Sequence, residues 1–187
     1  MSNTESLAGS FLVAMPQMLD PNFNKTVTLI CQHDENGALG VVINRRSEFP
    51  IGEVFKQLEL SVDRLGDAGL PVYIGGPVHP EVGLVLHTFP GEWESSLIIN
   101  DRLALTSSRD ILESLAAGGG PRQRLLTLGY AGWGAGQLEY EMQQNAWLNA
   151  PLDESLVFST PPEQRWQHAA RLLGIDISLL STEAGHA

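Results

Sequence analysis

The sequence predicts a single domain of mixed α and β structure, in which a largely antiparallel sheet is flanked by helices. Its 187 residues suit one domain, and a hydrophobic fraction of 43% is enough for a full core. The hydrophobic periodicity gives about seven strands, many of them in hairpins, and about four helices. Strands and helices do not alternate strictly, so a doubly wound nucleotide-binding fold is not indicated.

The first element is a short buried strand. Residues 1–8 are predicted to be a flexible N-terminus and residues 9–187 to form the single domain. Residues 11–15 are a continuous apolar run that Pro16 ends.

A β-hairpin comes next. Residues 26–33 alternate between two faces, and the Asn36-Gly37 pair is typical of a tight hairpin turn. Residues 39–44 should return antiparallel. Both faces of this returning strand are apolar, which predicts layers of structure above and below the sheet.

The middle of the chain adds one helix, four strands and a second hairpin. Apolar residues spaced i, i+3, i+4 and i+7 predict a helix over 51–58. The strands expected here are residues 72–74, 82–89, 97–99 and 103–105, the last two joined by Asn100-Asp101.

The last third contains two capped helices around another strand. Ser107 with Asp110 resembles a capping box and predicts a helix whose buried stripe ends near Ala116. Residues 125–128 form a strand. The final helix is predicted from a Thr160 cap followed by Pro161 at the first helical position.

Residues 129–139 are the most informative stretch, because four glycines surround one tryptophan between a strand and a helix. We interpret them as a sharp bend, either a site or a tight corner. An anion site is disfavoured, because Gln137 stands where the dinucleotide fingerprint needs glycine. Glu139 and Glu141 would also repel phosphate from the start of the helix.

The charge disfavours direct nucleic-acid binding. Eleven basic residues oppose 22 acidic ones, giving a net charge of -11. The basic residues are scattered, and the densest groups are Arg45 with Arg46 and Arg122 with Arg124. A nucleic-acid interface needs a stripe of clustered Lys and Arg, which this chain lacks.

The sequence contains no catalytic or metal-binding motif, and no cofactor or metal is predicted. The single cysteine, Cys31, excludes an intramolecular disulfide and should be a buried, inert thiol. Ser107 and Ser108 are better explained as helix caps than as nucleophiles. The N-terminus lacks the basic start of a secretory signal, and residues 11–15 are too short to span a bilayer. A cytoplasmic location without membrane association is therefore expected.

The chain resembles the YqgE/AlgH family of bacterial proteins over nearly its whole length. The blocks that carry the resemblance are residues 9–16 with Met18, Asp20, Pro21, Phe23 and 26–27; His33, 37–38, Gly40 and 42–45; 75–78 and 85–87; 106–108 and 110–112; and 128–133, 135–139, Glu141, Asn145 and 147–148. Arg46 departs from the pattern, since the family usually has proline there.

This resemblance implies a compact cytosolic domain with a mixed, partly barrel-like sheet, and it supplies no catalytic residues. The AlgH name is associated with the regulation of alginate production, sometimes described as transcriptional. Because the charge speaks against DNA contact, such an effect would pass through an unidentified protein or small-molecule partner.

We therefore expect a non-enzymatic binding or regulatory module with one groove where three segments meet. Arg45 would anchor a polar group, Trp133 would form an apolar wall and Glu139 would accept hydrogen bonds. The residues predicted to line the groove are Asn44, Arg45, Gly75, Gly76, Pro77, Gly132, Trp133, Gly134, Gly136 and Glu139. The alternatives are an enzyme, such as a hydrolase, with Glu139 or His33 as general base, and a direct DNA-binding protein.

Overall fold

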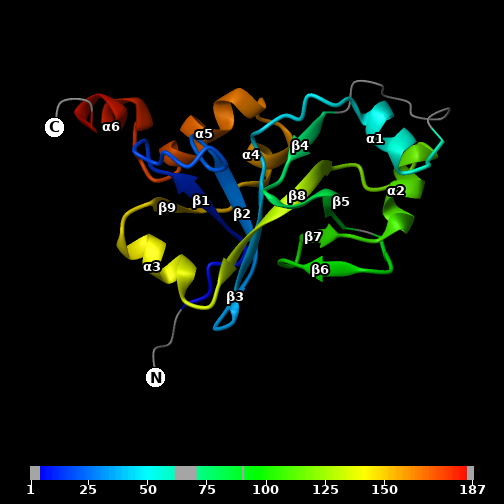
Figure 1. The fold of residues 1–187 in the computed structure, drawn as a ribbon, viewed down its shortest axis with the longest axis horizontal. Coiled ribbons are helices and arrows are strands. Elements are labelled where there is room, and N and C mark those ends of the chain that lie inside the picture. Colours follow the sequence, from blue (N-terminus) through cyan, green and yellow to red (C-terminus); the bar gives the residue numbers. More distant parts are fainter. Residues whose placement is uncertain (1–4, 62–70, 90, 185–187) are drawn as a thin grey trace.

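The computed structural model describes residues 5–61, 71–89 and 91–184, which form one curled sheet and its covering helices (Figure 1). The strands are β1 (Ser10–Ala14), β2 (Val27–Asp34), β3 (Gly37–Val42), β4 (Val72–Ile74), β5 (Val78–Thr88), β6 (Ser96–Ile98), β7 (Leu103–Thr106), β8 (Arg124–Gly134) and β9 (Trp147–Pro151). The helices are α1 (Ile51–Gln57), α2 (Arg109–Ala116), α3 (Gln137–Gln143), α4 (Glu154–Phe158), α5 (Pro162–Arg171) and α6 (Ile177–Ala184).

The sheet is mostly antiparallel and is centred on β8. Its strand order is β6-β7-β5-β8-β3-β2-β1-β9, and β4 pairs in parallel with the first part of β8. The sheet curls into a half-barrel (Figure 1). A Cβ on Gly9, before β1, would lie 3.9 Å from Ile99 Cγ2, just after β6. The expected mixed, partly barrel-like sheet with flanking helices is therefore confirmed.

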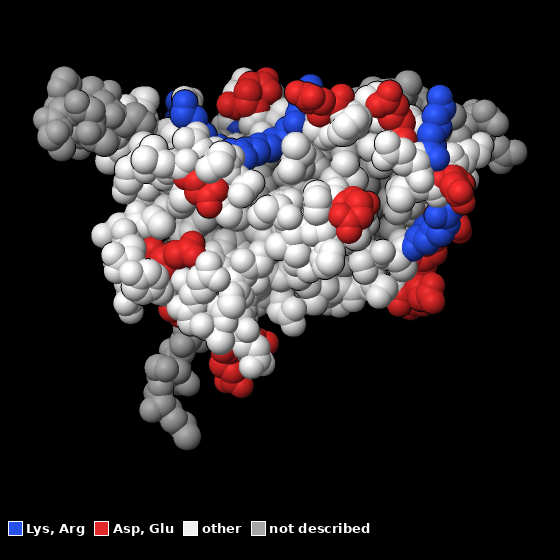
Figure 2. All heavy atoms as spheres, viewed as in Figure 1, with Lys and Arg blue, Asp and Glu red and all other residues white. Residues whose placement is uncertain are grey.

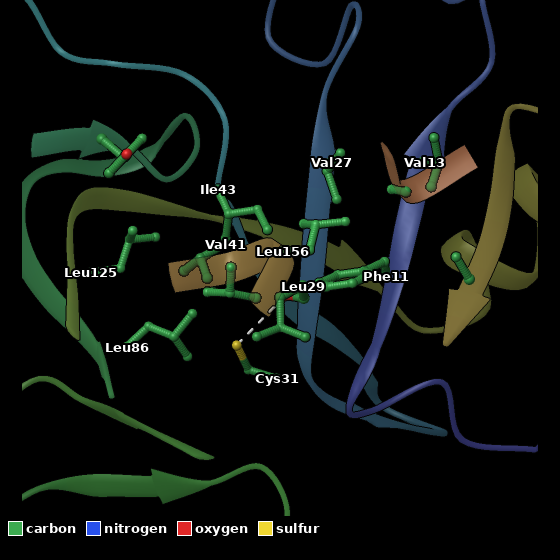
Figure 3. Close-up of a cluster of buried hydrophobic side chains, with 14 of the residues drawn as sticks. Phe11, Val13, Val27, Leu29, Cys31, Val41, Ile43, Leu86, Leu125 and Leu156 are labelled. Atoms are coloured by element: carbon green, nitrogen blue, oxygen red, sulfur yellow. Dashed lines mark hydrogen bonds between the residues drawn. The ribbon is translucent and has the colours of Figure 1, made fainter. Parts of the chain in front are cut away.

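The strands alternate their side chains between two faces, and each face has its own covering helices. One face packs against α4, α5 and the start of α6 around Leu29 and Leu86. Figure 3 shows Cys31 in this cluster, where burial raises the pKa of its thiol to about 12, although a backbone hydrogen bond at Val41 opposes the shift. The prediction of an inert cysteine agrees with this burial.

The opposite face is covered at two separate places. At one end of the sheet α1 and α2 pack on Val72, Val85 and Leu126. At the other end α3 packs on β1, β2 and β8 through Leu138, close to Trp133. Figure 1 shows α1 and α2 on one side of β8 and α3 on the other.

The glycine-rich stretch is the main difference from the sequence prediction, because most of it is strand. Strand β8 continues through Gly134, and the turn is confined to Ala135 and Gly136. Gly136 has a left-handed φ of 75°, a conformation that favours glycine, and it precedes the first residue of α3. Beyond Tyr130 the chain alternates, with Ala131 and Trp133 buried and the glycines between them exposed, as in a half-covered strand.

Several boundaries also differ. The first hairpin turn is formed by Glu35 and Asn36, one residue earlier than predicted, and the N-caps of α2 and α5 are Ser108 and Pro161, one residue later. The predictions omitted β9, α4 and α6. These elements are short or have little hydrophobic periodicity, so period counting detects them poorly.

The N-terminal residues that the structure describes are attached to the sheet. Ser6 Oγ donates a hydrogen bond to the carbonyl of His33 at 3.1 Å, and the Leu7 N–H donates to His33 Nδ1 at 2.9 Å. The rest of the predicted flexible segment, residues 1–4, lies outside the described residues. Within the described ranges, no helix combines the length and apolar character needed to cross a bilayer.

Candidate functional site

Asn44 and Arg45, which follow β3, fasten neighbouring loops to the sheet. The Asn44 side chain accepts from the Val27 N–H and donates to the Lys25 carbonyl, both at 2.9 Å. The Arg45 guanidinium donates to the carbonyls of Pro21 and Asn24. These guanidinium N–H groups already donate to carbonyls of the protein. If Arg45 anchored a ligand, as predicted, it would have to use its remaining N–H groups.

Gly75 and Gly76 allow two backbones to approach closely. A Cβ on Gly75 would lie 2.3 Å from the Gly129 carbonyl oxygen, and one on Gly76 would lie 2.2 Å from the Tyr130 carbonyl carbon. No side chain fits at such separations. These two glycines are buried against β8, and only the neighbouring Pro77 is exposed.

The structure places the predicted groove residues near both ends of β3. The first location holds Arg45 beside Gly75, since Ile74 N–H donates to the Arg45 carbonyl at 2.8 Å. The second lies at the other end of β3, where Gly37 pairs with Gly134 before the turn to α3. Gly132 lies between these two ends, opposite Leu39 and near Val78, so the predicted residues extend along the sheet.

Trp133 is part of a buried aromatic cluster at the second location. It is only 5% exposed, and its ring lies 6.1 Å from that of Phe23 and 6.2 Å from that of Trp147. Both indole N–H groups donate to Glu141 Oε1, at 3.2 Å and 3.0 Å. Trp133 therefore packs α3 onto the sheet and has only a small accessible edge.

His33 and Glu139, named separately as possible general bases, form one hydrogen-bonded pair. His33 Nδ1 accepts the Leu7 N–H, so the ring proton of the neutral imidazole resides on Nε2 and is donated to Glu139 Oε1. The His33 side chain is 2% exposed and that of Glu139 is 28% exposed. The pair joins β2, α3 and the N-terminal segment.

The environment of Glu139 favours its charged form. Partial burial by itself raises the pKa of this carboxyl, but the hydrogen bond from His33 and a backbone hydrogen bond outweigh it and lower the pKa below its ordinary value. Glu139 is therefore an ionised acceptor and a weak base at neutral pH.

A shallow hollow of about 370 Å³ lies over the first hairpin, and we name it the hairpin hollow. Its polar lining consists of the exposed side chains of Gln32, Asp34 and Asn36, and the buried Trp133 contributes one wall. The acidic and amide oxygens can accept hydrogen bonds from a ligand.

Two features of this region escaped sequence reasoning. The contact between His33 and Glu139 joins residues 106 positions apart, and no local pattern encodes it. The role of Glu141 as acceptor for two indoles follows only from the packing of α3. One sequence pattern does indicate the full length of β8: Ala131, Gly132, Trp133 and Gly134 alternate between larger and smaller residues, which is typical of a strand.

Three residues of strands β2 and β5 that carry metal-binding atoms, Cys31, His33 and His87, do not form a metal site. Cys31 lies in the core, His33 binds Glu139, and the buried His87 places Nε2 2.6 Å from Thr106 Oγ1. In the part of the chain that the structure describes, no three His, Cys, Asp or Glu side chains are grouped as metal ligands.

Comparisons with known proteins identify relatives over the full chain. The family model described as AlgH-like matches residues 11–178. A UPF0301 protein of Methylococcus capsulatus is 56% identical over 187 residues, which cover 99% of this chain and 98% of the relative.

Two solved structures share the fold. The solution structure of the AlgH protein from Pseudomonas aeruginosa is 46% identical with a TM-score of 0.81, covering 100% of this chain and 99% of that one. The crystal structure of a Corynebacterium diphtheriae protein is 25% identical with a TM-score of 0.72, covering 97% and 94%. The family match and these full-length similarities establish that the chain belongs to the YqgE/AlgH, or AlgH-like, family.

Proposed function

We propose that this protein is a non-enzymatic binding module of the cytoplasm whose recognition surface includes the hairpin hollow. The proposal rests on one observation: both ring nitrogens of His33 already form hydrogen bonds within the protein. One ring nitrogen accepts the Leu7 N–H and the other donates to Glu139, so neither is free to take a proton from a substrate. The polar groups that remain available line the hollow and suit binding rather than catalysis.

The alternative of an enzyme rests on the same pair. A carboxylate that orients an imidazole is a common catalytic arrangement, but there the second ring nitrogen faces the substrate. Here it faces a backbone N–H, and Glu139 is held in its ionised, weakly basic form. This geometry favours a structural role for the pair.

The partner that fits the hollow best presents hydrogen-bond donors or positive charge. Asp34 lines the hollow, and the whole chain carries a net charge of -11. A protein with an exposed basic segment, or a small cationic molecule, satisfies both features. Any regulatory effect on transcription or alginate production, as the family name suggests, would be transmitted through such a partner.

Affinity purification with charge-reversed variants tests the proposal. We expect the tagged protein to recover a specific partner from native lysate, and Asp34→Lys to lose it. Glu113→Lys is the matched control, because Glu113 is an exposed carboxylate on α2, away from the hollow lining. The recovered partner is then purified and its affinity for the three proteins is measured directly.

The expected result is a Kd at least about tenfold higher for Asp34→Lys than for Glu113→Lys, equivalent to about 1.4 kcal/mol. Equal affinities would exclude the hairpin hollow as the recognition surface. Turnover of a substrate in a broad screen that is abolished by Glu139→Gln, with the fold intact, would favour the enzyme alternative instead.

A further inference from the structure

A second hollow, of about 520 Å³, shares no lining residue with the hairpin hollow. It lies between the end of β5, the loop that joins β6 to β7, and the segment before β8. Its side chains include Thr88, Phe89, Asp101, Arg102, Arg122 and Gln123. Its volume is within the range of about 300–1,000 Å³ that is usual for small-molecule sites.

The lining of this hollow is less acidic than the molecule as a whole. Two guanidinium groups, Arg102 and Arg122, accompany one carboxylate, Asp101, in a chain with a net charge of -11. Arg122 is exposed and forms no ion pair with any residue of the described ranges. It can therefore meet an anion without breaking an internal contact.

Arg102 is held in place from outside the hollow. Its Nε and Nη2 donate to the two carboxylate oxygens of Glu154 at 2.6 Å and 3.1 Å. The Arg102 side chain is 70% exposed, and this two-point contact orients its guanidinium group and leaves the Nη1 edge free of the Glu154 contact. A pre-positioned arginine loses less side-chain entropy when it binds an anion.

Phe89 supplies an apolar surface beside these charges. Its side chain is 39% exposed, although large aromatic side chains are usually covered. The buried His87 packs edge-on against it, with ring centroids 6.5 Å apart and an interplanar angle of 85°. Thr88 and Gln123, joined by a backbone hydrogen bond of 3.2 Å, supply hydroxyl and amide groups nearby.

We propose that this hollow, which we name the arginine hollow, binds a small organic anion that carries a planar ring, of the size of a mononucleotide. Arg122 and the free edge of Arg102 contact the anionic group, and the ring stacks on Phe89. The proposal is independent of the hairpin hollow, so either site can fail without the other.

Calorimetric titration of the full chain at low salt with AMP, adenosine and inorganic phosphate tests the proposal. AMP combines both recognised features, so its Kd should be at least about tenfold lower than that of either part. Arg122→Gln should raise the Kd for AMP about tenfold. Arg109→Gln is the control, because Arg109 is an exposed arginine that pairs with Glu113 and does not line the hollow.

Phe89→Leu separates stacking from charge recognition. It should weaken AMP about fivefold or more and leave phosphate unchanged, because base–aromatic stacking contributes about 1–3 kcal/mol. Near-ultraviolet circular dichroism checks that each variant is folded. The absence of AMP binding at millimolar concentration, equal affinity for AMP and adenosine, or an equal loss in Arg109→Gln would each overturn the proposal.

Discussion

At the scale of single residues, several glycines of this chain allow two backbones to approach closely. Gly129 has a φ of 74°, and a Cβ there would lie 2.5 Å from the Gly76 carbonyl oxygen. Gly132, three residues later on the same strand, has only Val78 Cγ2 at 3.9 Å in its way. Position 129 therefore has no room for any side chain, whereas position 132 has room for a small one.

Replacement of Gly129 by alanine should destabilise the fold strongly. The methyl group clashes with a carbonyl of another segment and adds left-handed strain, so the free energy of unfolding should fall by about 2–4 kcal/mol. Urea denaturation measures the change. Gly132→Ala is the matched control and should stay within about 1 kcal/mol of the wild type; equal losses at both positions would contradict the close-approach interpretation.

Glu139 should contribute a pH-dependent part of the stability. Its folded-state pKa lies below its ordinary value of 4.5, so its contribution is complete above that value and is lost as the pH falls through the lower folded pKa. At pH 7, Glu139→Gln should cost about 1 kcal/mol, because the amide oxygen still accepts from His33 but lacks the charge that strengthens the hydrogen bond.

Unfolding measured between pH 7 and pH 3.5 checks this expectation. The difference between wild type and Glu139→Gln should shrink below about pH 4.5, because the wild-type carboxyl then becomes protonated. Glu35→Gln, at the exposed turn of the first hairpin, is the control and should show little difference. A gap between wild type and Glu139→Gln that stays constant with pH would show that the charge of Glu139 is unimportant.

At the scale of elements, helix α3 is attached to the sheet by an acidic side chain that accepts hydrogen bonds from two tryptophans. Glu141 Oε1 accepts both indole N–H groups, and Glu141 Oε2 accepts from the Gln137 amide at 2.9 Å. Helix α3 has seven residues, too few to be stable alone, so its structure depends on this packing.

Glu141→Ala should loosen α3, because it leaves two largely buried indole donors without an acceptor. The expected loss of unfolding free energy is about 2–4 kcal/mol, with a shift in tryptophan fluorescence. Glu141→Gln keeps an acceptor oxygen and should lose less than half as much. If both substitutions had the same effect, the hydrogen bonds to the indoles would not be the cause.

The elements also show what sequence reasoning can recover here. The strands and helices with clear periodicity, such as β2, α1 and α2, were predicted to within a few residues, because burial on one face imposes that pattern. The sequence predicts too short a range for β8, because glycines usually indicate a turn. In the structure, glycines of this strand such as Gly129 allow a neighbouring backbone to approach. The contact of His33 with Glu139 depends on the assembled tertiary structure and leaves no local pattern.

At the scale of the whole molecule, the surface charge should prevent direct binding to DNA. Figure 2 shows acidic and basic side chains interspersed on the face drawn, without a continuous basic stripe. The net charge is -11, so the long-range field repels a polyanion. The arginine hollow is a local exception of a size that suits a small molecule.

We therefore expect no retardation of duplex DNA in a gel-shift assay at about 50 mM salt, where electrostatic attraction would be strongest. The assay should use micromolar protein and random-sequence duplex, with a known basic DNA-binding protein as positive control. Retardation that weakens as salt is raised would show direct phosphate contact and restore the DNA-binding hypothesis.

Strand β8 also has a consequence for synthesis on the ribosome. It pairs with β3 and β4 along one edge and with β5 along the other, and it ends at Gly134. A nascent chain that stops before this strand cannot join the two portions of the half-barrel. The earlier strands therefore emerge with an incomplete sheet, and an emerging chain would need protection from self-association until β8 leaves the exit tunnel.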